Sequence, residues 1–345
     1  MSEHVRAVKG SNFETATTHK PSMGKLWGIV LAGGEGERVR TFLQQLCGGR
    51  GIKQFCAVTG FGSMVEHTLT RVEQIIPRQR ILVVVSRHHG QEVTEQLAHW
   101  PQQNVIFQPA NRDTTPGILL PLAHVSHRDP LATVVVFPSD HFIRDEERFV
   151  ASVEKAVAET KRFPEELTLL GMTPDKAEES YGWIESGDVE NGHESRRVRR
   201  FWEKPLRMQA QALMDRGALW NTFVFTAQAS TLWRMARQAA PDVYESFVEI
   251  RRAFGSRRAE QVTERIYATL RAVNFSSGVL EPLAAQLRVF PVPEVGWNDL
   301  GSVERILASL EQMGKLEARL SLYRAVVATA GPRAVAGADT RSTGH

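Results

Sequence analysis

Short apolar runs that do not alternate with polar residues are the feature that most constrains this fold. Four such runs, at 26–32 (LWGIVLA), 80–86 (RILVVVS), 104–108 (NVIFQ) and 133–137 (TVVVF), are bounded by turn residues. A strand covered on both faces is apolar throughout its length. We therefore predict central, parallel strands of an α/β sheet, with helices over residues 63–76, 90–100 and 115–127 between them.

The second half of the chain has a different pattern of predicted strands and helices. Strand-like segments at 167–172, 183–189, 198–203 and 220–226 are separated by a single helical stretch, and we expect them to cover one end of the sheet. Helices dominate 229–272, before a last strand at 287–293 and a helix near 303–313. We predict one domain over residues 25–317, with flexible tails at 1–24 and 318–345, where small and polar residues prevail.

Composition narrows the class of protein. The 345 residues are 42% hydrophobic, enough for a sizeable core, and the net charge is only +3. That balance argues against a nucleic-acid-binding surface, although small anionic ligands suit it. The sequence shows no secretory signal and no membrane span, and its two cysteines, Cys47 and Cys56, suit free thiols in a reducing cytoplasm. We expect a cytoplasmic protein, and a homo-oligomer is compatible with its sequence.

A glycine-rich loop follows the first strand. Gly33, Gly34 and Gly36 lack side chains, so their backbone N–H groups could approach a phosphate closely. The loop is not a P-loop, because no Gly-Lys-Ser/Thr follows, and its spacing does not fit a dinucleotide fingerprint. A tight structural turn is the alternative. Arg38 favours phosphate binding, because a guanidinium beside backbone donors can anchor a triphosphate.

Two aspartates and a lysine are open to two interpretations. Asp140 follows the strand at 133–137 and Asp299 precedes the helix near 303, so either could cap a helix or bind a ligand at the carboxyl edge of the sheet. Lys53, just ahead of apolar residues, could be a solvated surface lysine.

Eight motifs in order decide between these interpretations. They are LAGG-x-G-x-R, KQF, QPANRDTTP, FPSDH, YGWIE, FWEKP, WNTFVF and GWNDLGS, and they extend from about residue 26 to residue 306. Together they resemble the sugar-1-phosphate nucleotidyltransferase family, and within it the mannose-1-phosphate guanylyltransferases. The resemblance implies the nucleotide-diphospho-sugar transferase fold, a Rossmann-like mixed, mainly parallel sheet flanked by helices.

The resemblance also implies a role for each motif. It implies that the triphosphate is held by Gly33, Gly34, Gly36, Arg38 and Lys53, and that the nucleotide base, guanine, lies against Gln108, Asn111, Arg112 and Thr114. It implies that the sugar is bound by Gly182, Glu185 and Asn221, that Lys204 holds the phosphate of the sugar, and that Mg²⁺ is bound by Asp140 and Asp299. The catalytic residues would be Arg38, Lys53, Asp140 and Lys204.

The implied reaction transfers a nucleoside monophosphate from a nucleoside triphosphate, GTP by resemblance, to a sugar 1-phosphate, mannose 1-phosphate by resemblance. The sugar phosphate would attack the α-phosphorus in line, and pyrophosphate would leave. No covalent enzyme intermediate is needed.

The sequence departs from the family pattern in places. Glu37 stands where Thr is usual and would have to point outward or touch the metal. Ile52 replaces a proline, and the stretch 39–51 is longer and richer in glycine, which predicts a mobile flap over the triphosphate. Thr222 replaces a common Ser, and 274–276 reads Asn-Phe-Ser instead of Asp-Tyr-Ala, which leaves the sugar less defined.

Three alternatives stay open at this point. The same chemistry could act on another hexose or heptose 1-phosphate. A non-catalytic nucleotide-sugar-binding regulator could keep the fold, although the set of charged motif residues argues against it. A nicotinamide-dependent oxidoreductase is disfavoured, because Val58 and Thr59 stand where an acidic residue should bind the ribose.

Overall fold

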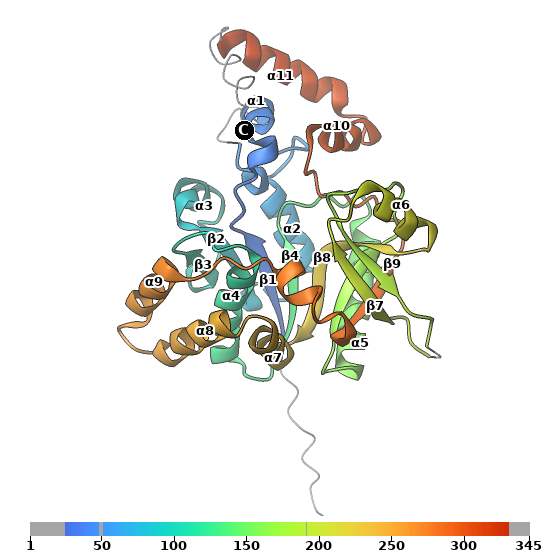
Figure 1. The fold of residues 1–345 in the computed structure, drawn as a ribbon. Coiled ribbons are helices and arrows are strands. Elements are labelled where there is room, and N and C mark those ends of the chain that lie inside the picture. Colours follow the sequence, from blue (N-terminus) through green and yellow to red (C-terminus); the bar gives the residue numbers. More distant parts are fainter. Residues whose placement is uncertain (1–24, 48–50, 191, 331–345) are drawn as a thin grey trace, which may run out of the picture.

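The computed structural model describes residues 25–47, 51–190 and 192–330, which fold around one nine-stranded sheet with helices on both faces (Figure 1). The strand order is β3-β2-β1-β4-β8-β5-β9-β7-β6. The strands are β1 (Leu26–Ala32), β2 (Ile81–Ser86), β3 (Val105–Gln108), β4 (Thr133–Pro138), β5 (Leu167–Met172), β6 (Gly182–Ser186), β7 (Arg196–Glu203), β8 (Leu219–Gln228) and β9 (Leu287–Val292). The helices are α1 (Arg40–Cys47), α2 (Met64–Glu73), α3 (Gly90–Gln96), α4 (Thr114–Arg128), α5 (Glu146–Arg162), α6 (Arg207–Asp215), α7 (Ala229–Ala239), α8 (Pro241–Ala253), α9 (Ala259–Thr269), α10 (Val303–Gln312) and α11 (Leu316–Ala330).

The first half of the sheet is parallel, as the apolar runs predict. β1 pairs in parallel with β2 and β4, and β2 pairs in parallel with β3. The expectation that all four runs are central is wrong for β3, which forms the edge of the sheet. Phe107 on this strand is 41% exposed. An apolar run of this length therefore did not distinguish an edge strand from a central one.

The second half of the sheet continues the first. β8 pairs antiparallel with β4 and with β5, and β9 returns parallel to β5. β6 and β7 form an antiparallel pair at the far edge. These strands therefore extend the same sheet, and the expectation that they cover one of its ends is wrong. The predicted mixed α/β sheet is confirmed, with the parallel pairing concentrated around β1.

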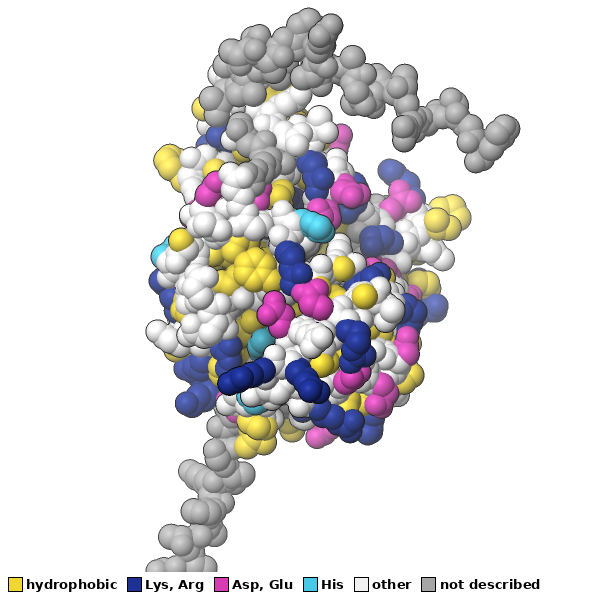
Figure 2. Space-filling model, turned by 90° about the vertical axis from the view of Figure 1, so that its left-hand side faces the viewer, with side chains coloured by type: hydrophobic (Ala, Val, Ile, Leu, Met, Phe, Trp, Pro, Cys, Tyr) yellow, Lys and Arg dark blue, Asp and Glu magenta, His cyan; other side chains and the backbone are white. Residues whose placement is uncertain are grey.

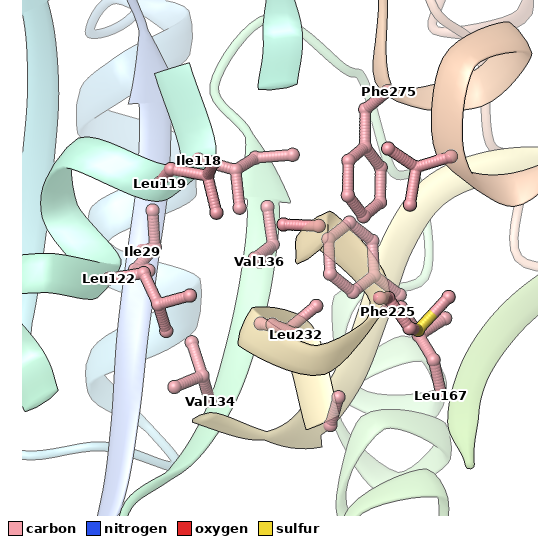
Figure 3. Packing of buried hydrophobic residues seen from close by; sticks show 14 of the residues in the cluster. Ile29, Ile118, Leu119, Leu122, Val134, Val136, Leu167, Phe225, Leu232 and Phe275 are labelled. Atoms are coloured by element: carbon pink, nitrogen blue, oxygen red, sulfur yellow. The ribbon is translucent and has the colours of Figure 1, made fainter. Parts of the chain in front are cut away.

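Two cores explain why the strand sequences are continuously apolar. Ile29 and Val136 point to one face of the sheet, where they pack with Leu122 of α4 and Leu232 of α7 (Figure 3). The adjacent residues of each strand, such as Val30, point to the opposite face, which is covered by α2, α3 and α5. Both faces of β1, β2 and β4 are therefore sealed from water.

A third, smaller cluster lies beside the amino-terminal loop. Leu43 and Leu46 of α1 are fully buried in a cluster that also contains residues of α10. Helix α11 packs against α1 as well (Figure 1). The mobile flap predicted for 39–51 is thus wrong for residues 40–47, because their apolar positions recur at helical spacing and are buried. Residues 48–50 lie outside the described residues.

The predicted carboxyl-terminal tail is also partly wrong. Residues 318–330 belong to α11, and Arg319 donates hydrogen bonds to the carbonyl oxygens of Leu46 and Ala57. Alanine-rich sequence favours a helix once such contacts are available. The remaining predicted tails, 1–24 and 331–345, lie outside the described residues.

The surface shows no concentrated charge on the face that carries α3, α8 and α9. Basic and acidic side chains are interspersed there (Figure 2). Within the described part of the chain, every helix is too short or too polar to cross a membrane.

Candidate active site

The glycine-rich loop leaves β1 at the carboxyl edge of the parallel strands. A Cβ on Gly33 would lie 2.9 Å from the side-chain oxygen of Gln108, and Gly36 has a φ of 60° with its Cβ position 3.1 Å from Lys53. A side chain at the first position would displace the Gln108 amide, and one at the second would be strained by the positive φ. The buried Gln54 holds the loop from inside, since its Nε2 donates 2.8 Å hydrogen bonds to the carbonyls of Ala32 and Gly34.

A cavity of about 750 Å³ opens against this loop, and we call it the nucleotide-side cavity. It is lined by Leu31, Gly33, Gly34, Glu37, Arg38, Val84, Gln108, Asn111, Asp113, Thr114, Gly117 and Ala272. Six residues predicted to bind the nucleotide are in this lining, whereas Gly36, Lys53 and Arg112 are not. The exposed Glu37 lines the cavity as well, so its carboxylate would face a bound phosphate.

Gln108 has the clearest sign of a missing ligand. Its side chain is only 7% exposed, yet its Nε2 finds no hydrogen-bond acceptor among the described residues. A buried amide donor without a partner costs about 1–3 kcal/mol, so such groups commonly serve a bound molecule. Gln108 lies in the lining of the nucleotide-side cavity, and its buried amide has to turn toward the cavity to donate to a ligand there.

Arg112 lies elsewhere. Its Nε and Nη2 each donate a 2.9 Å hydrogen bond, to the carbonyl oxygens of Tyr267 and Ala268 at the end of α9. A guanidinium in that position stabilises the carboxyl end of a helix. Its part in base binding stays a prediction, and these contacts give the side chain a structural role.

A second cavity of about 310 Å³ adjoins the first, and we call it the sugar-side cavity. The two share Leu31, Gly34 and Thr114. The other residues that line the second cavity are Gln54, Pro138, Ser139, Asp140, His141, Glu203, Lys204, Phe223, Asn274 and Ser276. The two cavities therefore lie side by side, and together they extend from the glycine-rich loop to the end of β4 and to the segments after β7 and α9.

Lys53 connects the residues that were predicted to be catalytic and metal-binding. Its side chain is buried, its Nζ lies 2.8 Å from Asp140 Oδ2, and it donates a hydrogen bond to the backbone oxygen of Asp299. Burial would raise the pKa of Asp140, but the charges of Lys53 and His141 outweigh burial and hold the pKa below its ordinary value. Asp140 is therefore an ionised carboxylate near neutral pH.

The carboxylate of Asp299 is held by several groups. Its Oδ1 accepts hydrogen bonds from Tyr181 OH at 2.8 Å and Gly301 N at 3.0 Å, and Arg305 Nε lies 3.2 Å away. Burial and the charge of Asp299 raise the pKa of Tyr181, so the phenol keeps its proton and remains a donor. The contacts on Oδ1 fix the orientation of the group and leave its second oxygen for another ligand.

Neither aspartate serves as a helix cap. The residue that caps α5 is Asp145, and the residue that caps α10 is Ser302. The capping interpretation of Asp140 and Asp299 is therefore wrong: the Asp140 carboxylate pairs with Lys53, and the backbone oxygen of Asp299 accepts a hydrogen bond from the same ammonium group.

The donor atoms fit a hard divalent cation. Asp140 Oδ1 is 3.9 Å from His141 Nε2, beyond hydrogen-bond distance, and the carboxylate lines the sugar-side cavity. Among the described residues, no cluster of three or more His, Cys, Asp or Glu side chains could hold a metal. Mg²⁺ commonly uses only one or two carboxylates and takes its other ligands from phosphates and water.

The predicted sugar-binding residues are not all at the cavity. Lys204 lines it, with Nζ 2.6 Å from Glu203 Oε1. Gly182 lies behind Glu203, because a Cβ there would be 3.1 Å from that carboxylate and 3.2 Å from Asn221.

Glu185 is outside the cavity lining. Its carboxylate accepts a 2.6 Å hydrogen bond from Trp202 Nε1 and pairs with Arg216 at 3.0 Å. Its contact with sugar hydroxyls stays a prediction, and it would require these partners to move.

Several residues at the site were not predicted. They are Gln54, Asp113, Glu203, Phe223, Asn274 and Ser276. Gln54, Asp113 and Glu203 lie inside the quoted motifs, so their positions were a usable signal. Asn274 and Ser276 belong to the segment 274–276, which the comparison with the family pattern had already linked to the sugar, and the fold places it at the sugar-side cavity.

Backbone strain is concentrated at the same place. Among the described residues, the non-glycine residues with positive φ are Asp113 (65°), Lys204 (52°), Phe223 (58°) and Leu300 (49°). The first three line the two cavities, and Leu300 follows Asp299. Strained backbone of this kind costs about 1–3 kcal/mol per residue and clusters at functional sites.

The mixed sheet, with a glycine-rich loop and two adjoining cavities at the carboxyl edge of its parallel strands, is typical of an α/β fold that binds nucleotides, and sequence comparison gives its family. The family model described as "Nucleotidyl transferase" matches residues 27–315, so the chain belongs to that family. The resemblance inferred from the motifs is thereby confirmed.

Individual relatives agree with the family. "Mannose-1-phosphate guanylyltransferase 2" of Escherichia coli O157:H7 is 28% identical over 79% of this chain and 58% of its own length. "Xanthan biosynthesis protein XanB" of Xanthomonas campestris pv. campestris (strain B100) is 30% identical over 83% of this chain and 60% of its own length. The chain thus spans somewhat less than two thirds of these relatives. A crystal structure described as "mannose-1-phosphate geranyltransferase", from Thermus thermophilus, has a TM-score of 0.69 and 26% identity, over 80% of this chain and 76% of its own.

Proposed function

We propose that this chain transfers a nucleoside monophosphate from GTP to mannose 1-phosphate, giving GDP-mannose and pyrophosphate. The observation that carries the proposal is the junction of the two cavities at Leu31, Gly34 and Thr114, with Asp140 in the lining of one and Arg38 in the lining of the other. Two anionic substrates in these cavities would meet at that junction. The names of the relatives described above support the choice of guanine and mannose.

The nucleotide would bind along the first cavity. The backbone N–H groups of Gly33 and Gly34, with Arg38, would face the phosphates, and the free amide of Gln108 would face the base. Gln54 fixes the conformation of the loop for this role. It donates hydrogen bonds to two carbonyl oxygens of the loop and does not occupy the loop's N–H groups.

The sugar phosphate would bind in the second cavity, where Lys204 offers a cation. One of its phosphate oxygens attacks the α-phosphorus of the triphosphate, and a new P–O bond forms. The bond from the α-phosphorus to the oxygen that bridges to the β-phosphate breaks, and pyrophosphate leaves with that electron pair. A phosphate dianion needs no general base, so positioning and charge neutralisation carry the reaction.

Members of this family act with a divalent metal, and here we propose Mg²⁺ on Asp140 and Asp299. When bound, the ion supplies positive charge to phosphate oxygens during transfer. Lys53, paired with Asp140, contributes a second positive charge. Tyr181 and Arg305 keep the Asp299 carboxylate oriented.

The test is pyrophosphate release from the purified chain with Mg²⁺, using four nucleoside triphosphates and several hexose and heptose 1-phosphates. We expect one strongly preferred pair, GTP with mannose 1-phosphate, and loss of its turnover in Asp140→Ala. Asp188→Ala is the matched control, because that carboxylate is 97% exposed and pairs with Arg199 at the surface. Nucleotide binding without pyrophosphate release from any pair would contradict the proposal and favour a regulatory protein.

A further inference from the structure

Asp113 has a backbone conformation that side chains rarely adopt. Its φ is 65° and its ψ is −171°, in a region populated almost only by glycine. Asp113 nevertheless precedes α4 at the wall of the nucleotide-side cavity. Strain at a cavity wall is a reason to ask what the side chain does there.

Contacts with a distant segment hold Asp113 in this conformation. Along the backbone, Val273 N donates to the Arg112 oxygen at 3.2 Å and Thr115 N donates to the Val273 oxygen at 2.9 Å. On the side chain, Oδ1 accepts from Thr114 N at 2.6 Å and from Asn274 Nδ2 at 3.2 Å. Among the described residues no donor hydrogen-bonds Oδ2, so one carboxylate oxygen is available to a ligand.

The same cavity carries an acceptor and a donor for a base. Asp113 supplies a carboxylate, and Gln108 supplies an amide whose Nε2 has no partner among the described residues and would reach a base by turning toward the cavity. Guanine presents N1–H and N2–H₂ as adjacent donors, and O6 and N7 as acceptors. Adenine places an acceptor at N1, and the pyrimidines place a carbonyl beside their ring nitrogen, so either would turn a lone pair toward the carboxylate.

We infer that Asp113 is a specificity-determining residue that selects guanine by accepting hydrogen bonds from its N1–H and N2–H₂ groups. The inference rests on the proposed function and refines its nucleotide side. Asn274 and Thr114 saturate Oδ1 and so orient the carboxylate, and Gln108 completes the recognition with a hydrogen bond to the acceptor edge of the base. The strained backbone keeps the carboxylate in place.

The test measures dissociation constants of GTP and ITP with calcium in place of magnesium, so that binding is read without turnover. ITP lacks only the N2 amino group. We expect wild-type protein to bind GTP about ten-fold or more tightly than ITP, because one charge-assisted hydrogen bond is lost. In Asp113→Gly the ratio should fall to about one, through weaker GTP binding, with Asp113→Asn in between. Asp188→Asn is the control and should keep the wild-type ratio.

Folding does not confuse this test, because glycine accepts the backbone angles of residue 113 and the Asp113→Gly protein should melt no lower than wild type. A GTP to ITP ratio near one in wild type, or a ratio unchanged in Asp113→Gly, would overturn the inference and leave the proposed function standing. A wild-type protein that binds no nucleoside triphosphate would refute both.

Discussion

The two adjoining cavities differ in how their polar groups are used. On the nucleotide side, the cavity is lined by the glycine-rich loop, by Arg38 and by Gln108, whose Nε2 has no hydrogen-bond partner among the described residues. On the sugar side, the charges are paired with one another, as Lys204 is with Glu203 and Lys53 is with Asp140. A sugar phosphate therefore has to compete with a protein carboxylate for Lys204, whereas a nucleotide meets backbone and amide groups that form no ion pairs.

The two ion pairs differ in what it takes to break them. The side chain of Lys204 is 53% exposed, and a pair of that kind contributes about 0–1 kcal/mol, so a phosphate can replace Glu203 at little cost. In the second pair Lys53 is 6% exposed and Asp140 is 36% exposed, so breaking it leaves a buried ammonium unpaired and costs up to about 3–5 kcal/mol. Lys53 should thus remain in place through the reaction cycle, while Lys204 exchanges partners.

The largest expected effect comes from the buried pair. Asp140→Asn removes a charge that Lys53 and the metal both use, so turnover should fall about 1,000-fold or more, as it does when a group that stabilises developing charge is lost. GTP affinity should stay within about three-fold, because Asp140 is absent from the lining of the nucleotide-side cavity. Pyrophosphate release and equilibrium nucleotide binding measure the two quantities. A similar loss of turnover and of GTP affinity would show that Asp140 also contributes to nucleotide binding, which would contradict the separate roles of the two cavities.

A smaller effect is expected from the exposed pair. Lys204→Ala should raise KM for the sugar 1-phosphate by about 30-fold, because a charge-assisted contact with phosphate is lost, and should leave GTP binding unchanged. Glu203→Gln is the matched variant, since it frees Lys204 from its carboxylate partner and should leave KM equal or lower. A rise of KM in both variants would mean that the intact Lys204–Glu203 ion pair is needed for sugar-phosphate binding.

The smallest effect concerns the orientation of Asp299. Tyr181→Phe deletes one hydrogen bond to its Oδ1, and we expect Mn²⁺ affinity to fall about ten-fold, as is usual for residues that orient a metal ligand. Mn²⁺ titration followed by electron paramagnetic resonance reads binding directly, without turnover. Tyr244→Phe, in α8, is the control. Unchanged Mn²⁺ affinity in Tyr181→Phe would exclude an orienting role.

Local sequence predicted some of these features well and others poorly. β1 and β5 begin and end at the expected residues, because strands covered on both faces have an unambiguous apolar pattern. The loop glycines and Asp140 each lie just after such a strand, but their roles were implied by the resemblance to the family and not by the strand pattern.

The contacts that sequence did not predict are those in which a side chain finds a partner far along the chain. Arg112 bonds to carbonyls 155 and 156 residues away, and Glu185 pairs with Arg216, contacts that no local pattern encodes. Asp113 was passed over because its role depends on a backbone angle, which its residue type does not suggest.

The most direct test of the contrast between the cavities is calorimetric titration with mannose 1-phosphate, with and without a non-hydrolysable GTP analogue and Mg²⁺. If the nucleotide side is ready and the sugar side is occupied by its own ion pairs, mannose 1-phosphate should bind at least about ten-fold more tightly once nucleotide and metal are present, because their charges complete its site. Equal affinity in the two titrations would contradict this difference between the cavities.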